Sequence, residues 1–233
     1  MKTLCVVQHI EAEYLGFLED HLESRSIRFR YFRPFTAGGK LPEKIDEFDG
    51  LVLLGAGPYG IVSGPLLPSL GPELRLARRF LDAGKSAVGI GLGAILLAVA
   101  AGGGAEVAPL RFAVGQAGRA TGETLAGMLP ERFAYAVYVR DAPVLPPQAA
   151  ILARDEDGQP LAFSLGGNLL GFLNHPGIKT AMAEDIVMEF EETPPETADA
   201  ILRLRESQAA IAEALSTMMV GVVRFCGWMA ASS

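Results

Sequence analysis

Cysteine, clustered basic residues and long apolar runs are all scarce in this sequence. Only two of its 233 residues are cysteines, Cys5 and Cys226, and they lie at opposite ends of the chain. This excludes a cysteine-based metal site or disulfide framework and indicates a reducing compartment. The net charge is −7 and no run of Lys and Arg exceeds two residues, so we expect no nucleic-acid binding.

Neither end of the chain carries a segment typical of membrane insertion or export. The first apolar run is short and is closed by Gln8, His9 and Glu11, so we interpret it as a strand rather than a signal peptide. The apolar tail is interrupted by Arg224 and Gly227 and is too short to span a bilayer. We therefore predict a soluble, cytoplasmic protein that forms one domain over residues 1–233.

Apolar strands alternate with helical stretches through the first half of the chain. The pattern predicts an α/β fold, with a mostly parallel central sheet in a three-layer, flavodoxin-like arrangement flanked by helices. The predicted strands are 3–8, 27–32, 50–55, 86–90, 135–139, 150–154, 161–164 and 169–173. The predicted helices are 14–24, 72–84, 94–101, 180–190 and a long C-terminal helix at about 197–225.

Two glycine-rich loops could suggest phosphate binding. "GAGPYG" at 55–60 follows a strand and has the spacing of a dinucleotide-binding loop, but Pro65, Pro68 and Pro72 exclude the helix that this site requires. "GIGLGA" at 89–94 lacks the Lys-Ser/Thr pair of a P-loop. We therefore expect no cofactor, and the sequence shows no metal-binding motif.

The stretch "SAVGIGLGAILLA" (86–98) instead has the form of a nucleophile elbow. In such an elbow, a sharp turn between a strand and a helix exposes its apex residue at the helix N-terminus, where N–H groups stabilise an anion. The apex here is Gly91. We expect backbone donors for an oxyanion at Leu92 and Gly93, and at Gly57 in the neighbouring loop.

These motifs resemble the class I glutamine amidotransferase domain, in particular its free-standing, GMP-synthase-like members. The elbow "GIGLGAILLA" is similar to the family's Gly-Ile-Cys-Leu-Gly-Ala-Gln-Leu-Leu-Ala. The "GAGP" loop is similar to its Gly-Gly-Pro loop, and "HPG" at 175–177 to its His-Pro-Glu. The segment 140–155 also follows the family pattern, and the similarity extends over about residues 51–190. It implies the same α/β fold.

The departures from the family pattern fall on its catalytic triad. In the family a cysteine attacks glutamine, a histidine activates the cysteine and a glutamate orients the histidine. The corresponding positions here are Gly91, His175 and Gly177, so two of the three have no side chain. The glutamine of the elbow is replaced by Ile95, and the family's Glu-Ile-Gly-Trp has no clear counterpart.

We therefore predict a catalytically inactive relative that acts as a binding or assembly subunit. Its cleft would hold a small anionic or amino-acid-like ligand. The alternative is an active glutamine amidotransferase or γ-glutamyl hydrolase with a non-standard or partner-supplied nucleophile. None of Cys5, Ser86 and Cys226 is expected beside the elbow.

Several other polar residues have simpler interpretations. His175 is either a vestigial base or a structural histidine at a strand end. We favour the second interpretation, because a base needs both a nucleophile and a group that orients it. Arg111, Arg140 and Asp141 are interpreted as solvated loop charges rather than pocket residues. His9 and His21 are expected at the surface or at strand ends.

The C-terminal helix carries an apolar seam with one polar position. Its members follow alternating steps of three and four residues: Ile201, Leu204, Gln208, Ile211, Leu215, Met218, Val222 and Phe225. Such a seam either packs on the chain's own sheet or forms an interface with a second copy or another protein. Both alternatives stay open, and the second predicts a homodimer or a protein partner.

Overall fold

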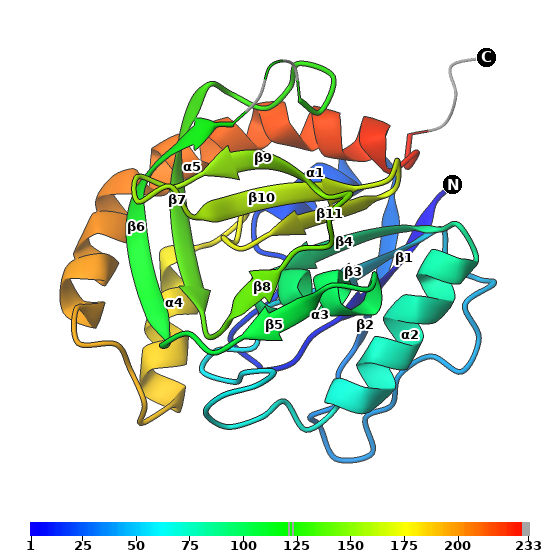
Figure 1. The fold of residues 1–233 in the computed structure, drawn as a ribbon, viewed down its shortest axis with the longest axis horizontal. Helices are drawn as coiled ribbons and strands as arrows, with labels where there is room; N and C mark the ends of the chain where they lie inside the picture. Colours follow the sequence, from blue (N-terminus) through cyan, green and yellow to red (C-terminus); the bar gives the residue numbers. More distant parts are fainter. Residues whose placement is uncertain (121, 123, 230–233) are drawn as a thin grey trace.

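A computed structural model describes residues 1–120, 122 and 124–229. Its centre is a nine-stranded sheet in the order β2-β1-β3-β4-β11-β10-β9-β6-β7 (Figure 1). The predicted α/β fold is confirmed. A separate two-stranded ribbon pairs β5 (Gly104–Glu106) with β8 (Ala142–Val144).

The first part of the sheet is parallel and contains the strands that carry the glycine loops. Each of β1, β3, β4 and β11 pairs in parallel with its neighbours in this part of the sheet, and β2 forms the edge. Strands β3, β4 and β11 are buried along their whole length, as their apolar sequences require. The bounds are β1 Thr3–Val7, β2 Arg28–Phe32, β3 Gly50–Leu53, β4 Ser86–Ile90 and β11 Leu169–Phe172.

The second part of the sheet is antiparallel and is less evident in the sequence. Strand β6 was not predicted, because its sequence RFAVGQAGR contains two glycines and little apolar character in its second half. It forms a long hairpin with β7, which begins three residues earlier than expected. The bounds are β6 Arg111–Arg119, β7 Arg132–Val139, β9 Ala150–Arg154 and β10 Pro160–Leu165.

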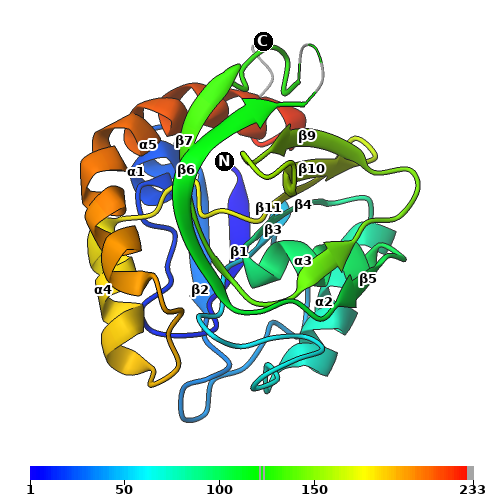
Figure 2. The ribbon, with the colours of Figure 1, turned by 60° about the vertical axis from the view of Figure 1, so that its left-hand side comes forward.

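Helices cover both faces of the sheet (Figures 1 and 2). Helices α2 and α3 pack together on one face, whereas α1, α4 and α5 lie on the other. The bounds are α1 Leu18–Glu23, α2 Leu70–Asp82, α3 Leu92–Ala100, α4 Thr180–Glu189 and α5 Thr197–Phe225. Helix α1 is shorter than the predicted 14–24, because the chain before Leu18 forms an irregular segment. No helix in the described ranges is long and apolar enough to cross a membrane.

The seam of α5 packs on the chain's own sheet and on α4. Gln208, its polar member, accepts hydrogen bonds from the backbone N–H and hydroxyl of Thr180 and donates to the carbonyl oxygen of Ile178. It therefore caps the start of α4. The apolar members are mostly buried within the protomer: Leu204, Ile211, Leu215, Met218 and Val222 are each at most 5% exposed, and Ile201 and Phe225 are half-buried.

These side chains therefore offer little free surface to a partner. The structure favours the intramolecular alternative for the seam, and a partner bound through another face of the molecule stays a prediction.

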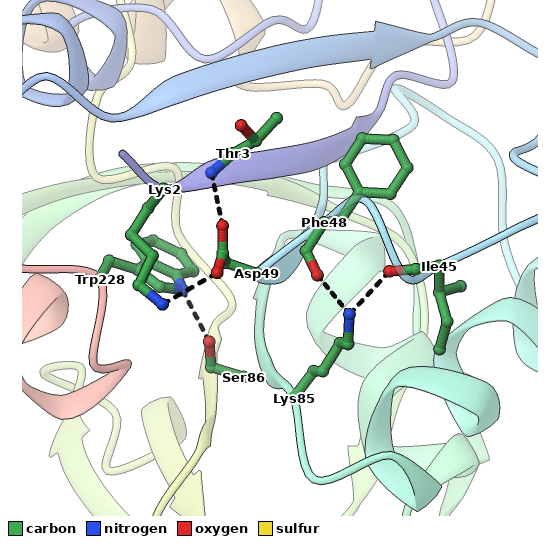
Figure 3. A network of polar contacts seen from close by, with 8 residues as sticks. All are labelled: Lys2, Thr3, Ile45, Phe48, Asp49, Lys85, Ser86 and Trp228. Carbon is green, nitrogen blue, oxygen red and sulfur yellow. Dashed lines mark hydrogen bonds and ion pairs between the residues drawn. The ribbon is translucent and has the colours of Figure 1, made fainter.

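The chain beyond α5 is anchored at the N-terminal edge of the parallel strands (Figure 3). The indole Nε1–H of Trp228 donates to Oγ of Ser86, the first residue of β4, at 2.6 Å, and Trp228 is only 3% exposed. Nearby, Asp49 accepts bonds from Lys2 Nζ and the Thr3 N–H. The C-terminal end of the described chain thus stabilises the sheet directly.

We expect Trp228→Phe to lower the free energy of unfolding by about 1–3 kcal/mol, because it leaves a buried hydroxyl at Ser86 without its partner and removes packed atoms. Thermal unfolding of the purified protein measures this loss. Met229→Ala is the matched control, since Met229 is 47% exposed. An equal change in both variants would contradict the anchoring role of Trp228.

Candidate functional site

Gly91 forms a sharp turn between β4 and α3, as the sequence predicts. Its backbone angles are φ 55° and ψ −123°, a region in which residues with a side chain are strained. Its N–H donates to the carbonyl oxygen of Phe172 at the end of β11. Gly93 lies so close to Leu53 of β3 that a side chain would overlap the Leu53 carbonyl. The backbone of a nucleophile elbow is therefore present.

The apex has room for a small side chain. A Cβ atom added to Gly91 would lie 3.3 Å from Cα of Gly55 and 3.8 Å from the carbonyl oxygen of Tyr138. These contacts are tight but not prohibitive. The turn itself therefore does not exclude a small side chain at residue 91, and glycine stands there by sequence.

Gly177 differs from Gly91 because neighbouring backbone atoms lie too close to it for a side chain. A Cβ atom there would lie 2.8 Å from the carbonyl oxygen of Leu15 and 2.9 Å from the N of Leu18. The Gly177 carbonyl accepts a hydrogen bond from the Phe17 N–H. Both neighbours belong to the backbone around the start of α1, so a glutamate at residue 177 would require that backbone to move.

His175 is buried and hydrogen-bonded to the same part of the chain. Its Nε2 lies 2.7 Å from the carbonyl oxygen of Tyr14. A carbonyl only accepts, so Nε2 carries the proton and donates. Burial lowers the pKa of His175 to about 4, so the ring is neutral near pH 7. Its Nδ1 has no hydrogen-bond partner among the described residues.

The expected oxyanion donor Gly57 is already occupied by a carboxylate of the protein. Its N–H donates to Oε2 of Glu13 at 2.5 Å, and Glu13 is 4% exposed. The other oxygen of Glu13 lies against Gly55, where a Cβ atom would overlap it. Burial raises the pKa of Glu13 to about 7, against the lowering effects of the Gly57 N–H and of His9. The N–H groups of Leu92 and Gly93 remain at the start of α3, but that of Gly93 bonds to Leu54.

A buried ion pair between His9 and Glu73 also contacts the glycine loop. His9, at the end of β1, lies between the carbonyl oxygen of Gly55 (3.0 Å from Nδ1) and Oε2 of Glu73 (2.6 Å from Nε2). Both neighbours are acceptors, so an imidazolium satisfies both. Burial by itself would lower the pKa of His9, but the charge and hydrogen bond of Glu73 raise it above its ordinary value. Of the two expectations for His9, the strand end is confirmed and the surface is wrong, because the ring is only 2% exposed.

Arg140 and Asp141 are also buried, and the interpretation as solvated loop charges was wrong for both. Arg140 donates from Nε to the Pro58 carbonyl oxygen and pairs with Glu192. Asp141 accepts bonds from the N–H groups of 61–63 and from the Ser63 hydroxyl. Burial alone would raise the pKa of Asp141, but these hydrogen bonds lower it. The two side chains hold the segment that follows "GAGP" against the end of β7.

Arg111 is half-buried and pairs with the buried Asp155 at 2.7 Å, so it too is not a freely solvated charge. The sequence gives no signal for Glu13 or Glu73. Both read as ordinary polar residues of a loop and of a helix start, and only the fold brings them to the glycine loop.

No thiol lies at the elbow. Cys5 is in the core of β1, where burial raises its pKa to about 12, and burial also raises the pKa of Cys226. Ser86 lies at the opposite end of β4 from Gly91. The described residues contain no group of three or more His, Cys, Asp or Glu that could hold a metal ion.

Solved structures show which proteins share this fold. A glutamine amidotransferase from Thermotoga maritima has a TM-score of 0.82 at 21% identity and covers 97% of this chain and 98% of its own. A glutamine amidotransferase from Methylobacillus flagellatus also has a TM-score of 0.82 at 21% identity, and the match covers 100% of this chain and 97% of the other. A putative GMP synthase subunit from Thermoplasma acidophilum has a TM-score of 0.58 at 18% identity, and the match covers 90% of this chain and 98% of the other. No protein-family model and no curated protein matches the chain.

We expect the stability contributed by Glu13 to fall as the pH rises from about 4.5 to 7. In that window the unfolded chain has released the proton that the folded state still holds on Glu13. Glu13→Gln keeps an oxygen for the Gly57 N–H and removes the titration.

The unfolding temperature of Glu13→Gln relative to the natural protein should therefore be higher at pH 8 than at pH 5, by an amount worth about 2 kcal/mol. The exposed Glu213→Gln serves as control. A difference that does not change with pH would contradict this assignment of Glu13.

Proposed function

On this glutamine amidotransferase-like scaffold, we propose that the chain is a catalytically inactive protein that acts as a binding or assembly subunit. One observation carries the proposal. The elbow keeps its backbone geometry at Gly91 but has no nucleophile, while the Glu13 carboxylate of the same chain occupies the Gly57 N–H beside it.

The surroundings of the other two triad positions support the same conclusion. The proton on Nε2 of His175 is bonded to the Tyr14 carbonyl, and a carboxylate at residue 177 has no space. The Tyr14 carbonyl holds the ring through Nε2, which leaves Nδ1 as its basic nitrogen. A histidine in such a triad acts by accepting the proton of a nucleophile, and residue 91 has no side chain to supply one.

Apolar side chains also surround the glycine loop at Gly57. At Gly57, an added Cβ atom would lie 2.9 Å from the Ile10 side chain and 3.2 Å from the ring of Phe190. Phe190 in turn packs edge-on against Tyr59, with ring centroids 6.0 Å apart. Apolar side chains therefore lie over the loop that would bind a polar carboxamide in an active relative.

The alternative, an active amidotransferase or hydrolase with an unusual nucleophile, requires a reactive group from elsewhere. Both cysteines of the chain are buried with raised pKa values, which disfavours the thiolate. A nucleophile from a partner would have to displace Glu13 from Gly57. Assays of the purified chain alone and with proteins that co-purify from the native source distinguish these cases.

We expect no glutamine hydrolysis by the purified protein, because loss of the nucleophile in a comparable triad lowers turnover by about 10⁶-fold. Gly91→Cys should fold, although its side chain is strained at φ 55°, and should remain inactive because the Glu13 carboxyl group occupies the Gly57 N–H. Gly177→Ala should unfold at a lower temperature than Gly91→Cys.

Release of ammonia and glutamate from glutamine is the measurement, with thermal unfolding of each variant beside it. Hydrolysis by the natural protein that persists in Cys5→Ala and Cys226→Ala would overturn the proposal. Hydrolysis that appears in Gly91→Cys alone would leave the natural protein inactive, and would contradict the argument that Glu13 blocks the Gly57 N–H.

A further inference from the structure

A cavity of about 640 Å³ lies between the β6–β7 hairpin and the rest of the sheet. Its walls come from β6, the end of β7, β8, the start of β10 and the turn before α5. None of Gly57, Gly91 and His175 lines it. Its volume is within the range of small-molecule sites, about 300–1,000 Å³.

The topology of the sheet explains why this space exists. Strand β6 pairs with β9 only through Gly118 and Arg119, at its C-terminal end. From there the hairpin curves away from β9 and β10 (Figure 2), so the start of β6 pairs with β7 but not with β9. Pro160 opens β10 beside the gap and has no N–H with which to extend the pairing.

The walls are apolar and unusually rich in proline. Val137, Val139 and Leu173 line the cavity from the sheet. Five prolines complete the walls: Pro109 before β6, Pro143 from β8, Pro160 from β10, and Pro194 with Pro195 from the turn before α5. Proline rings have no side-chain rotamers to lose when a ligand binds, so such walls are preorganised for an apolar molecule.

The charges that line the cavity disfavour an anion. The guanidinium of Arg111 is paired with Asp155, and the Asp141 carboxylate is bonded to 61–63. Glu106 and Glu196 are exposed, and neither forms an ion pair within the described part of the chain. Two uncompensated carboxylates therefore face an entering molecule.

We propose that this cavity binds a small apolar molecule that carries no negative charge. The inference deepens the proposed binding function but rests on a different part of the molecule from the elbow. Glutaminase activity would therefore overturn the proposed function without affecting the proposal for this cavity. Failure of the cavity to bind the probes would overturn the cavity proposal without affecting the conclusions about the elbow.

The test uses three probes with the same indole ring: tryptophol, which is neutral, tryptamine, a cation, and indole-3-acetate, an anion. Binding to the full-length chain is measured by calorimetry and by saturation-transfer NMR. We expect tryptophol and tryptamine to bind at least fivefold more tightly than indole-3-acetate, a ratio that exposed carboxylates can produce at low salt.

Two sets of variants locate the binding. Ala142→Trp fills the cavity from the half-buried β8 position and should abolish binding of all three probes, whereas Ala209→Trp on the exposed face of α5 should leave it unchanged. The double variant Glu106→Gln, Glu196→Gln should bring indole-3-acetate to within about twofold of tryptophol. Glu191→Gln with Glu213→Gln, both exposed, is its charge-matched control.

The proposal is overturned if neither tryptophol nor tryptamine binds, or if indole-3-acetate binds as tightly as they do. Binding that survives in Ala142→Trp, with the variant shown by thermal unfolding to be folded, would also overturn it. Glu106 and Glu196 are exposed, so we expect the double variant to fold. The charge argument can therefore be tested even if Ala142→Trp does not fold.

Discussion

The hydrogen bond from the Gly57 N–H to the Glu13 carboxylate is the contact on which the candidate site depends. It places a buried carboxyl group at the glycine loop, where burial raises its pKa to about 7. The charge on His9 compensates the buried carboxylate of Glu73. The chain between β1 and α1 then continues over the site, where Tyr14 bonds to His175 and Phe17 to Gly177. A segment of the protein itself thus lies against the glycine loop, His175 and Gly177.

The turn at Gly91 has a backbone conformation that favours glycine. With a side chain, the conformation at residue 91 would cost of order 1–3 kcal/mol. Strained backbone of this kind is common at active sites. Glycine adopts it without that strain. The turn persists because other contacts require it, in particular the bond from the Gly91 N–H to Phe172 and the close approach of Gly93 to Leu53.

Much of the fold could be predicted from the sequence, because its parallel strands are short apolar runs bounded by glycine and proline. Strand β4 and helix α5 have the predicted bounds. Strand β6 was missed because its glycines and polar residues weaken the strand pattern, and α1 was predicted too long because Tyr14 and Leu15 have helical spacing but belong to the irregular segment. Whether a weak strand pattern pairs in the sheet, or a helical pattern stays irregular, depends on tertiary contacts that local sequence does not encode.

The site was predictable only in part, for a similar reason. The elbow, the glycine loop and the histidine are local motifs, so their positions could be read directly. Glu13 and Glu73 lie far apart in the sequence, and nothing local marks either as a partner of the glycine loop or of His9. The burial of Arg140 and Asp141 likewise depends on the segment after Pro58, which packs against the end of β7 only in the folded chain.

The pH dependence of the Gly57 amide signal in a ¹H–¹⁵N NMR spectrum tests the central contact most directly. The amide proton should shift with a midpoint near pH 7, following the titration of Glu13, and this shift should vanish in Glu13→Gln. A Gly57 amide that does not respond to pH between 5 and 8, or that responds equally in Glu13→Gln, would show that the carboxylate does not occupy the oxyanion position.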